Sequence, residues 1–266
     1  MAKLGFIGIG NMGGALAKAA AKKVPGKEIL VSSKRWEHAR DFAQEHQLVA
    51  STNESVARGS KFVILGVKPQ YMEEVLGGLK PILEVRTDAV LVTMAAGLTM
   101  DNIASMLGGG YPVIRIMPNT PAGVGQGLIV YDANDRVNQA DLNEFLDLME
   151  GAGLFDRLPE HLIDAASAVA GCSPAFYCQI LEAMADGGVA CGLPRDKALV
   201  YAAQAMLGTA QLVLTTGQHP GALKDAVCSP GGSTIQGVRA LERGGLRSSM
   251  MEAVIAAYEK NKEFIK

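Results

Sequence analysis

The stretch that decides the fold is Leu4-Gly5-Phe6-Ile7-Gly8-Ile9-Gly10-Asn11-Met12-Gly13-Gly14-Ala15. An apolar run leads into Gly8-x-Gly10-x-x-Gly13, and an alanine-rich helical pattern follows it. In such a unit Gly8 allows the tight turn, Gly10 lets a pyrophosphate approach the backbone, and Gly13 lets the helix pack against the strand. The pattern predicts a dinucleotide site. A plain strand–turn–helix is the alternative, because loops also use glycine for turns.

The segment after the second predicted strand bears on the choice between NAD and NADP. That strand is Glu28-Ile29-Leu30-Val31, and Ser32-Ser33-Lys34-Arg35 follows it. An NAD site commonly places a carboxylate here for the ribose 2′-hydroxyl. Hydroxyls and two cations suit a 2′-phosphate instead, so Ser33, Lys34 and Arg35 predict NADP, with NADPH preferred over NADH. The alternative is that Lys34 and Arg35 only begin a solvated helix over 35–47.

Composition favours a globular enzyme. The 266 residues suffice for one large or two modest domains, and 48% hydrophobic but only 5% aromatic content predicts an aliphatic core. A net charge of −2 gives no reason to expect nucleic acid or an anionic membrane as a partner. We expect no transmembrane helix, because no apolar stretch of about 20 residues stands out, and no signal peptide. The expected location is cytoplasmic.

The cysteines and histidines do not suggest a metal site or disulfides. Cys172, Cys178, Cys191 and Cys228 form no C-x-x-C pair and do not cluster in sequence with the four histidines. We therefore expect reduced thiols, no metal, and no catalytic histidine.

Strands and helices alternate from the N-terminus to about Arg157. Apolar runs typical of strands buried on both faces occupy 61–67, 89–94 and 113–117, and 127–131 is a further candidate. This alternation predicts an α/β fold with a doubly wound, mostly parallel sheet of Rossmann type.

Three residues follow the carboxyl ends of those strands, where ligands bind in such sheets. They are Lys68, Ala96 and Asn119, and each is a candidate for the nicotinamide half of the cleft. For Pro118-Asn119-Thr120-Pro121 a rigid turn is an equally good interpretation, and both roles can hold at once.

The chain changes character after its first part, because strand patterns vanish from Leu162 onward. Helices are expected over 173–191, 194–216 and 246–264. The helix over 194–216 is small and apolar around much of its circumference, so it must be buried. A domain this small cannot bury it alone. The sequence thus predicts a Rossmann domain, 1–157, followed by an all-α substrate and dimerisation domain, 158–266.

A second glycine-rich motif, Ser229-Pro230-Gly231-Gly232-Ser233-Thr234, precedes a predicted helix. Glycines before a helix leave backbone N–H groups free, and the helix dipole favours an anion there. Since the cofactor phosphates already have a site, this motif suits a small carboxylate substrate. The alternative is a plain turn with Ser233 or Thr234 as N-cap.

At this point the chain resembles the pyrroline-5-carboxylate reductase family over nearly its whole length. The motifs that carry the resemblance are, in order, Phe6-Ile7-Gly8-Ile9-Gly10-Asn11-Met12, Val67-Lys68-Pro69, Ala95-Ala96-Gly97, Met117-Pro118-Asn119-Thr120-Pro121, Ala185-Asp186-Gly187-Gly188-Val189, Gly192-Leu193-Pro194, His219-Pro220-Gly221-Ala222-Leu223-Lys224-Asp225 and Ser229-Pro230-Gly231-Gly232-Ser233-Thr234. The last two together are specific to the family, whereas the first is shared with many oxidoreductases.

The resemblance implies NAD(P)H-dependent reduction of the C=N bond of a cyclic imine acid to proline, the last step of proline biosynthesis. It also implies a homodimer of interlocked helical domains, often assembled into larger rings, with a decamer as one candidate. The implied substrate-binding residues are Ser229, Gly231, Gly232, Ser233 and Thr234, and Thr234 is the catalytic candidate that bonds the ring nitrogen. The cofactor-binding residues are Ile7, Gly8, Ile9, Gly10, Asn11, Met12, Ser33, Lys34, Arg35, Asn53, Val67, Lys68, Pro69, Ala96, Gly97 and Asn119. One departure is Cys172, where the family usually has glycine.

Two other functions are weighed against this one. A hydroxy-acid dehydrogenase of the same layout needs a positioned base, usually Lys or His, and the helix over 173–191 contains neither. A non-enzymatic nucleotide-binding regulator would not need the motif at 229–234.

Overall fold

A computed structural model describes residues 1–263, which form two compact units. Among the described residues, the sheet unit spans Met1–Cys172 and residues 257–263, and the helical unit spans Ser173–Ala256. The first unit extends beyond 157 because the helix α7 (Glu160–Ala166) packs with β6 and β7, and the π-helical turn Ser167–Gly171 follows α7 and accepts a hydrogen bond from Asn119. The domain boundary between 157 and 158 stays a prediction.

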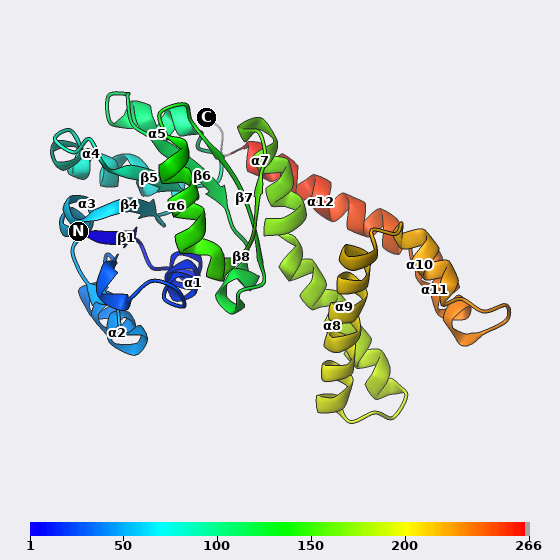
Figure 1. The fold of residues 1–266 in the computed structure, drawn as a ribbon. Helices are drawn as coiled ribbons and strands as arrows, with labels where there is room; N and C mark the ends of the chain where they lie inside the picture. Colours follow the sequence, from blue (N-terminus) through cyan, green and yellow to red (C-terminus); the bar gives the residue numbers. More distant parts are fainter. Residues whose placement is uncertain (264–266) are drawn as a thin grey trace. The chain divides into compact units, whose positions relative to one another are not determined.

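The sheet unit is built on one eight-stranded sheet with the order β3-β2-β1-β4-β5-β6-β7-β8 (Figure 1). The strands are β1 (Ala2–Ile7), β2 (Ile29–Ser32), β3 (Val49–Ala50), β4 (Ser60–Leu65), β5 (Val90–Thr93), β6 (Val113–Met117), β7 (Gly127–Ala133) and β8 (Gly153–Arg157). Neighbouring strands are parallel except β6 and β7. The strand order reverses between β1 and β4, which is the switch point where such sheets bind ligands.

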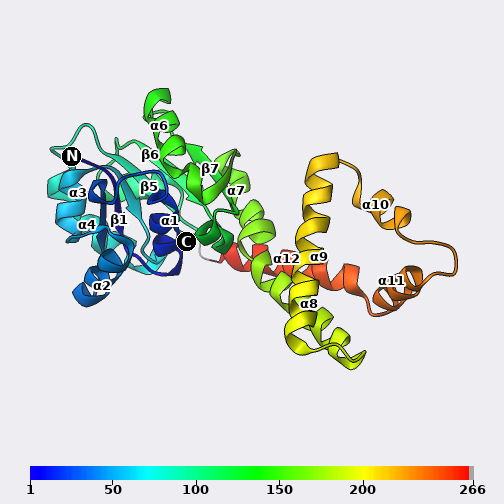
Figure 2. The ribbon, with the colours of Figure 1, turned by 60° about the horizontal axis from the view of Figure 1, so that its bottom comes forward.

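Helices cover both faces of the sheet (Figures 1 and 2). On one face the core includes side chains of α1 (Asn11–Ala20), α2 (Trp36–His46) and α6 (Gln139–Met149). On the other face it includes side chains of α3 (Asn53–Gly59), α4 (Met72–Leu83) and α5 (Met100–Met106). The central strands are therefore buried on both sides, as their continuous apolar sequences predict.

The prediction of a doubly wound, mostly parallel sheet is confirmed. The strand expected over 113–117 has those bounds, and the strand expected over 61–67 runs from Ser60 to Leu65. The sequence interpretation missed β3, which is only two residues long, and β8. In β8 only part of the strand is apolar and its last two residues are Asp156 and Arg157, because it lies at the sheet edge.

The helical unit is expected from sequence. Its helices are α8 (Ser173–Ala190), α9 (Arg195–Thr216), α10 (Pro220–Ala226), α11 (Ser233–Arg243) and α12 (Leu246–Lys262), which continues into the sheet unit. Four of these helices lie close to the predicted ones, whereas α10 was not predicted. The predicted end of the last helix at Phe264 lies outside the described residues.

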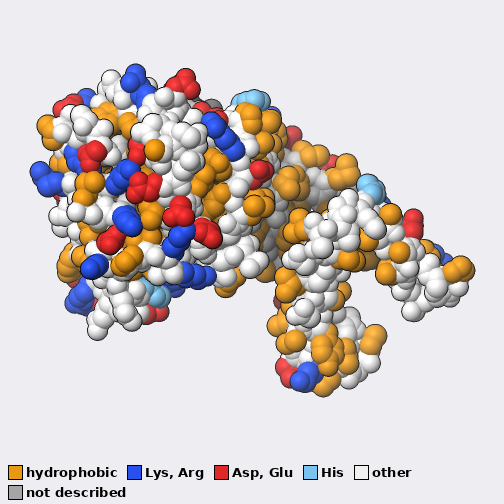
Figure 3. Space-filling view, in the orientation of Figure 1, with side chains coloured by type: hydrophobic (Ala, Val, Ile, Leu, Met, Phe, Trp, Pro, Cys, Tyr) orange, Lys and Arg blue, Asp and Glu red, His pale blue; other side chains and the backbone are white. Residues whose placement is uncertain are grey.

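Most of the helical unit's apolar surface is uncovered within one chain. Only Ala198 and Ala202 of α9 are buried, while Val200 and Leu214 are 60% and 78% exposed. Hydrophobic side chains gather over α8 and α9 in Figure 3. The helix α9 is also long and apolar enough to cross a membrane by length and composition. The expectation that no such stretch exists was wrong, because residues 198–216 contain no charged side chain.

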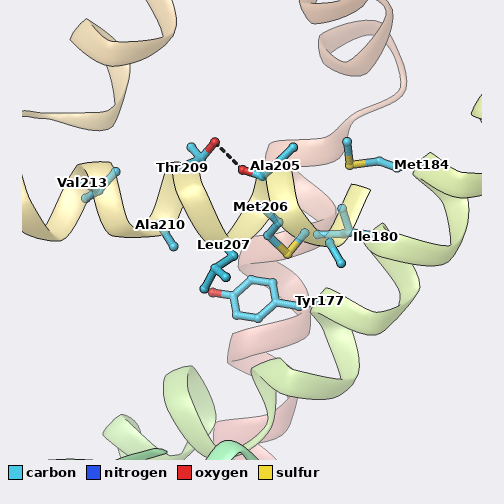
Figure 4. A pocket seen from close by; sticks show the side chains of 10 residues that line it. Tyr177, Ile180, Met184, Ala205, Met206, Leu207, Thr209, Ala210 and Val213 are labelled. Carbon is cyan, nitrogen blue, oxygen red and sulfur yellow. Dashed lines mark hydrogen bonds between the residues drawn. The ribbon is translucent and has the colours of Figure 1, made fainter. Parts of the chain in front are cut away.

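An apolar groove of about 650 Å³ lies between α8 and α9. Figure 4 shows Tyr177 and Ile180 of α8 facing Met206 and Leu207 of α9, with Val213 further along the same helix. Thr209 lines the groove but donates its hydroxyl hydrogen to the carbonyl oxygen of Ala205, over 2.8 Å. The groove therefore offers hardly any free polar group, and it suits another apolar surface.

Candidate functional site

The first glycine turn has the geometry that its sequence predicts. Gly8 has a φ of +93°, and a Cβ built on Gly13 would lie 2.1 Å from the carbonyl oxygen of Gly8. Neither position accepts a side chain without strain. A Cβ on Gly10 would meet no described atom within 4 Å. The backbone at Gly10 therefore faces open space that can hold a phosphate group.

The side chains around this turn divide into buried and exposed ones. Ile7 and Ile9 are 1% and 2% exposed, so only their backbone can meet a ligand. Asn11 is exposed as the first residue of α1, and Met12 is half-buried as the second.

Two helix N-termini, one in each unit, share a feature that suits anions. α1 begins after Gly10 and α11 after Gly232, and neither has a side-chain cap or an acidic residue in its first turn. Thr52, Thr99 and Asn138, by contrast, cap α3, α5 and α6 through their side chains. Among the described α-helices with a defined N-cap, only α1 and α11 combine both properties. Free N–H groups and the helix dipole favour phosphate or carboxylate there.

Asn53 is held beside the end of β2. The buried hydroxyl of Ser32 donates to Asn53 Oδ1 over 2.7 Å, and the same hydroxyl lies 3.2 Å from the carbonyl oxygen of Phe6. This network fixes Asn53, one of the predicted cofactor-binding residues, next to β1 and β2.

The residues predicted to bind the 2′-phosphate, Ser33, Lys34 and Arg35, directly follow β2. Ser33 Oγ lies 3.3 Å from Nδ1 of His38. Lys34 and Arg35 are exposed, and Lys34 Nζ is 5.7 Å from the ring centre of Tyr71. A hydroxyl and two solvent-facing cations at the end of β2 suit a phosphate, which would pair with both charges.

The carboxyl ends of β4, β5 and β6 line a hollow of about 310 Å³. Its lining residues are Met12, Gly66, Val67, Lys68, Pro69, Met94, Ala95, Ala96, Met117 and Pro118. The structure thus brings together five residues predicted from sequence, namely Met12, Val67, Lys68, Pro69 and Ala96. Gly97 follows in a left-handed turn with a φ of +74°. The other five lining residues were not predicted as site residues. Gly66, Met94 and Met117 lie within the apolar runs 61–67, 89–94 and 113–117, which were interpreted as buried strands, and Ala95 and Pro118 directly follow two of those runs.

Asn119 is predicted at the same sheet edge, and its side chain is already engaged. The residue is 9% exposed. Its Oδ1 accepts from the backbone N–H of Leu128 over 3.0 Å, and its Nδ2 donates to the carbonyl oxygen of Ala170 over 3.1 Å. The rigid-turn interpretation of this segment therefore has direct support.

The motif at 229–234 lies in the helical unit and forms a tight turn into α11. Gly231 has a φ of +71°, and the N–H of Gly232 donates to the carbonyl oxygen of Ser229 over 3.0 Å. The N-cap is Gly232, while Ser233 and Thr234 are the first helical residues and are exposed. The alternative that Ser233 or Thr234 serves as N-cap is therefore wrong, and both hydroxyls face solvent.

Other expectations concern metals and thiols. No group of His, Cys, Asp and Glu within residues 1–263 is arranged to hold a metal ion. The four cysteines are free.

Two family comparisons cover most of the chain. Residues 160–264 match the family described as pyrroline-5-carboxylate reductase dimerisation. Residues 3–97 match the family described as NADP oxidoreductase, coenzyme F420-dependent.

Individual relatives are similar to this chain over nearly its whole length. The chain is 40% identical to pyrroline-5-carboxylate reductase of Pisum sativum, over 98% of this chain and 95% of the relative. It is 39% identical to that of Escherichia coli, over 99% and 98%. The structure of Plasmodium falciparum pyrroline carboxylate reductase with NADP bound superposes with a TM-score of 0.90 at 31% identity, over 100% of this chain and 98% of that one. The Streptococcus pyogenes 1-pyrroline-5-carboxylate reductase gives 0.88 at 34% identity, over 98% of each chain.

The different roles of two glycines can be separated by substitution. Gly10→Ala should leave the melting temperature nearly unchanged, since its Cβ meets open space, but should weaken NADPH binding about 10-fold or more by filling the phosphate position. Gly13→Ala should instead lower the melting temperature, because its Cβ would collide with the Gly8 carbonyl. Calorimetry and a fluorescence titration with NADPH measure the two effects. Equal loss of stability in both variants would contradict the assignment.

Proposed function

Because the chain belongs to the pyrroline-5-carboxylate reductase family, we propose that its two uncapped helix N-termini bind the two reactants, α1 the cofactor and α11 the substrate. The chain is an NAD(P)H-dependent oxidoreductase that reduces the C=N bond of 1-pyrroline-5-carboxylate to L-proline, the last step of proline biosynthesis. The main support for the substrate site is the N-terminus of α11, which has no acidic residue in its first turn. The cofactor phosphates are assigned to the N-terminus of α1, so the N-terminus of α11 is available for the substrate.

The cofactor of this chain is NADP, with NADPH preferred over NADH. The open backbone at Gly10 fits its pyrophosphate, and Ser33, Lys34 and Arg35 fit the 2′-phosphate that NAD lacks. The apolar hollow at the ends of β4 to β6 suits the nicotinamide ring. When bound, NADPH supplies the hydride, and the protein contributes orientation and electrostatics.

The substrate is held by its carboxylate and its ring nitrogen. The N–H of Gly232 is engaged with Ser229, so the backbone N–H groups of Ser233 and Thr234 bind the carboxylate, helped by the dipole of α11. The hydroxyl of Thr234, which faces solvent and caps no helix, bonds the ring nitrogen. An imine nitrogen takes a proton easily, so no strong general acid is required. This hold orients the C=N bond for reduction.

The two rival functions call for different features. α8 carries neither Lys nor His, which leaves a hydroxy-acid dehydrogenase without a base on that helix. A regulator that only binds nucleotide would not turn over substrate. Steady-state oxidation of NADPH by the imine acid, with proline identified as product, tests the proposed function, and absence of turnover would contradict it.

We further propose that the groove between α8 and α9 is covered by a second copy of the chain. The dimerisation match spans both helices, and the exposed apolar surface of α9 resembles half of an obligate interface. The membrane-like composition of α9 is then that of an interface helix, in keeping with a cytoplasmic enzyme. A homodimer is the minimal assembly, and a decamer is the larger one that sedimentation can reveal.

The cofactor preference has a direct test. The Michaelis constant should be lower for NADPH than for NADH, and Lys34→Ala with Arg35→Ala should narrow the gap because the 2′-phosphate loses its cations. Each lost pair is worth about 1 kcal/mol or less, since both side chains are exposed. Steady-state kinetics with both cofactors give the ratio. Equal constants in the unmodified enzyme would refute the preference.

The role of Thr234 can be separated from a structural one. Thr234→Ala should lower kcat/KM by roughly 10- to 100-fold, about 1.4–2.7 kcal/mol, while Thr234→Ser keeps the hydroxyl and most of the activity. The melting temperature should stay unchanged in both, because Gly232 and not Thr234 occupies the N-cap. A Thr234→Ala enzyme with full activity would exclude the proposed bond to the ring nitrogen.

Charged side chains placed in the groove should prevent dimerisation. Met206→Asp with Val213→Asp should yield insoluble or inactive protein, because buried unpaired charges cost several kcal/mol each. Met206→Leu with Val213→Ile keeps the groove apolar and should preserve both assembly and activity. Sedimentation velocity and proline formation are the measurements. A soluble, monomeric and fully active aspartate variant would rule out the requirement for a partner.

A further inference from the structure

We propose that residues 160–171, α7 with the π-helical turn, form a positioning strap that fixes the point where the chain leaves the sheet unit, and that Arg115 and Asn119 are its anchors. The strap connects the walls of the predicted nicotinamide hollow to the start of the helical unit. The inference rests on the proposed function, since it assigns the anchors a part in presenting the substrate.

The first anchor is a buried arginine. The side chain of Arg115, on β6, is 2% exposed and lies between two carboxylates of α7. Its Nη2 donates to Asp164 Oδ1 over 2.7 Å, and its Nη1 is 3.5 Å from Glu160 Oε1. A buried ion pair adds little stability compared with apolar side chains of similar size. Arg115 therefore contributes more to the position of α7 than to the free energy of unfolding.

Glu160 extends this anchor to the neighbouring loop. Its Oε1 also accepts from the backbone N–H of Met100 over 2.7 Å, and Met100 is the first residue of α5, shortly after Ala96 in the hollow's wall. Its own N–H donates to Asp132 Oδ2 on β7 over 2.9 Å. The start of the strap is thus bonded to β6, β7 and α5 at once.

The second anchor is Asn119. It follows Met117 and Pro118, which line the hollow, and its Nδ2 donates to the carbonyl oxygen of Ala170 in the π-helical turn over 3.1 Å. Its Oδ1 accepts from Leu128 N–H on β7. One amide therefore ties the turn to the sheet at the hollow's edge.

The strap ends in a geometry that is uncommon in helices. Residues Ser167–Gly171 form a π turn, closed by the N–H of Cys172 donating to the carbonyl oxygen of Ser167 over 3.0 Å. Such turns are rare and recur at functional sites. The first segment of the sheet unit ends at Cys172, and α8 begins at the next residue. Whatever holds this turn also fixes the first residue of the helical unit.

An isosteric substitution cuts one bond of the strap selectively. Asn119→Asp keeps the acceptor for Leu128 N–H but replaces the donor to Ala170 with a repelling oxygen. Asn134 provides a matched control, because its Oδ1 accepts from Val113 N–H over 3.1 Å and its Nδ2 donates to the Tyr111 carbonyl over 2.9 Å at the other end of β6. Asn134→Asp makes the same chemical change without touching the strap. Asp164→Asn weakens the other anchor without adding charge near the hollow.

The full-length enzyme is compared for four properties. They are kcat, the deuterium isotope effect on kcat with NADPH labelled at the transferred position, NADPH affinity, and hydrogen exchange of the amides of residues 167–171 without cofactor. Asn119→Asp and Asp164→Asn should speed exchange in this turn, lower kcat by about 10- to 100-fold through misplacement, and raise the isotope effect. NADPH affinity should stay within about 2-fold, because both polar atoms of the Asn119 side chain bond to protein backbone and the pyrophosphate and 2′-phosphate contacts are untouched. Asn134→Asp should change none of the four, even if it lowers the melting temperature equally.

The outcomes separate the strap from the proposed function. If the unmodified enzyme reduces the imine acid and Asn119→Asp matches it in kcat, isotope effect and exchange, the strap is wrong and the function stands. Equal changes in Asn119→Asp and Asn134→Asp would also overturn the strap, because a general loss of stability would then explain both. An unmodified enzyme that does not reduce the imine acid would overturn the function and the strap together.

Discussion

The crowding around the carbonyl oxygen of Gly8 is the constraint on which the sheet unit depends. A Cβ on Gly13 would lie 2.1 Å from this oxygen, and a Cβ on Gly66 would lie 2.3 Å from it. α1 and the end of β4 therefore approach the first turn more closely than any side chain permits. The same approach leaves the N-terminus of α1 free and places Gly66 in the wall of the hollow. The backbone around Gly8 thus determines both how α1 and the end of β4 pack and the shape of the predicted cofactor site.

Much of the fold could be predicted because its signals are local. Continuous apolar runs identified β4, β5 and β6, and glycine spacing identified both helix N-termini that suit anions. β8 was missed, since a short edge strand with two charged residues resembles a loop in sequence. The predicted cofactor residues are distributed along the chain, yet five of them line one hollow, because parallel strands end at the same sheet edge.

The anchors of residues 160–171 show what sequence could not reveal. No role was predicted for Arg115 within the apolar strand 113–117, and its partners Glu160 and Asp164 lie more than forty positions away. Asn119 was predicted as a ligand residue or as part of a rigid turn, and its amide joins β7 to Ala170, while the ligand role stays a prediction. Long-range polar contacts of this kind leave no periodic pattern. The composition of α9 does not tell a membrane helix from a helix at a protein interface, because an apolar helix suits both surroundings.

The uncovered apolar face of α8 and α9 has a consequence for how newly made chains assemble in a cell. In the proposed dimer, a newly made chain carries this face until it meets another chain. The rate of dimer formation then rises with the square of the concentration of unpaired chains, while competing aggregation also grows. Chaperones that shield such faces would matter most when synthesis is slow. In the proposed dimer one defective copy can capture a sound one, so a damaged allele can act dominantly.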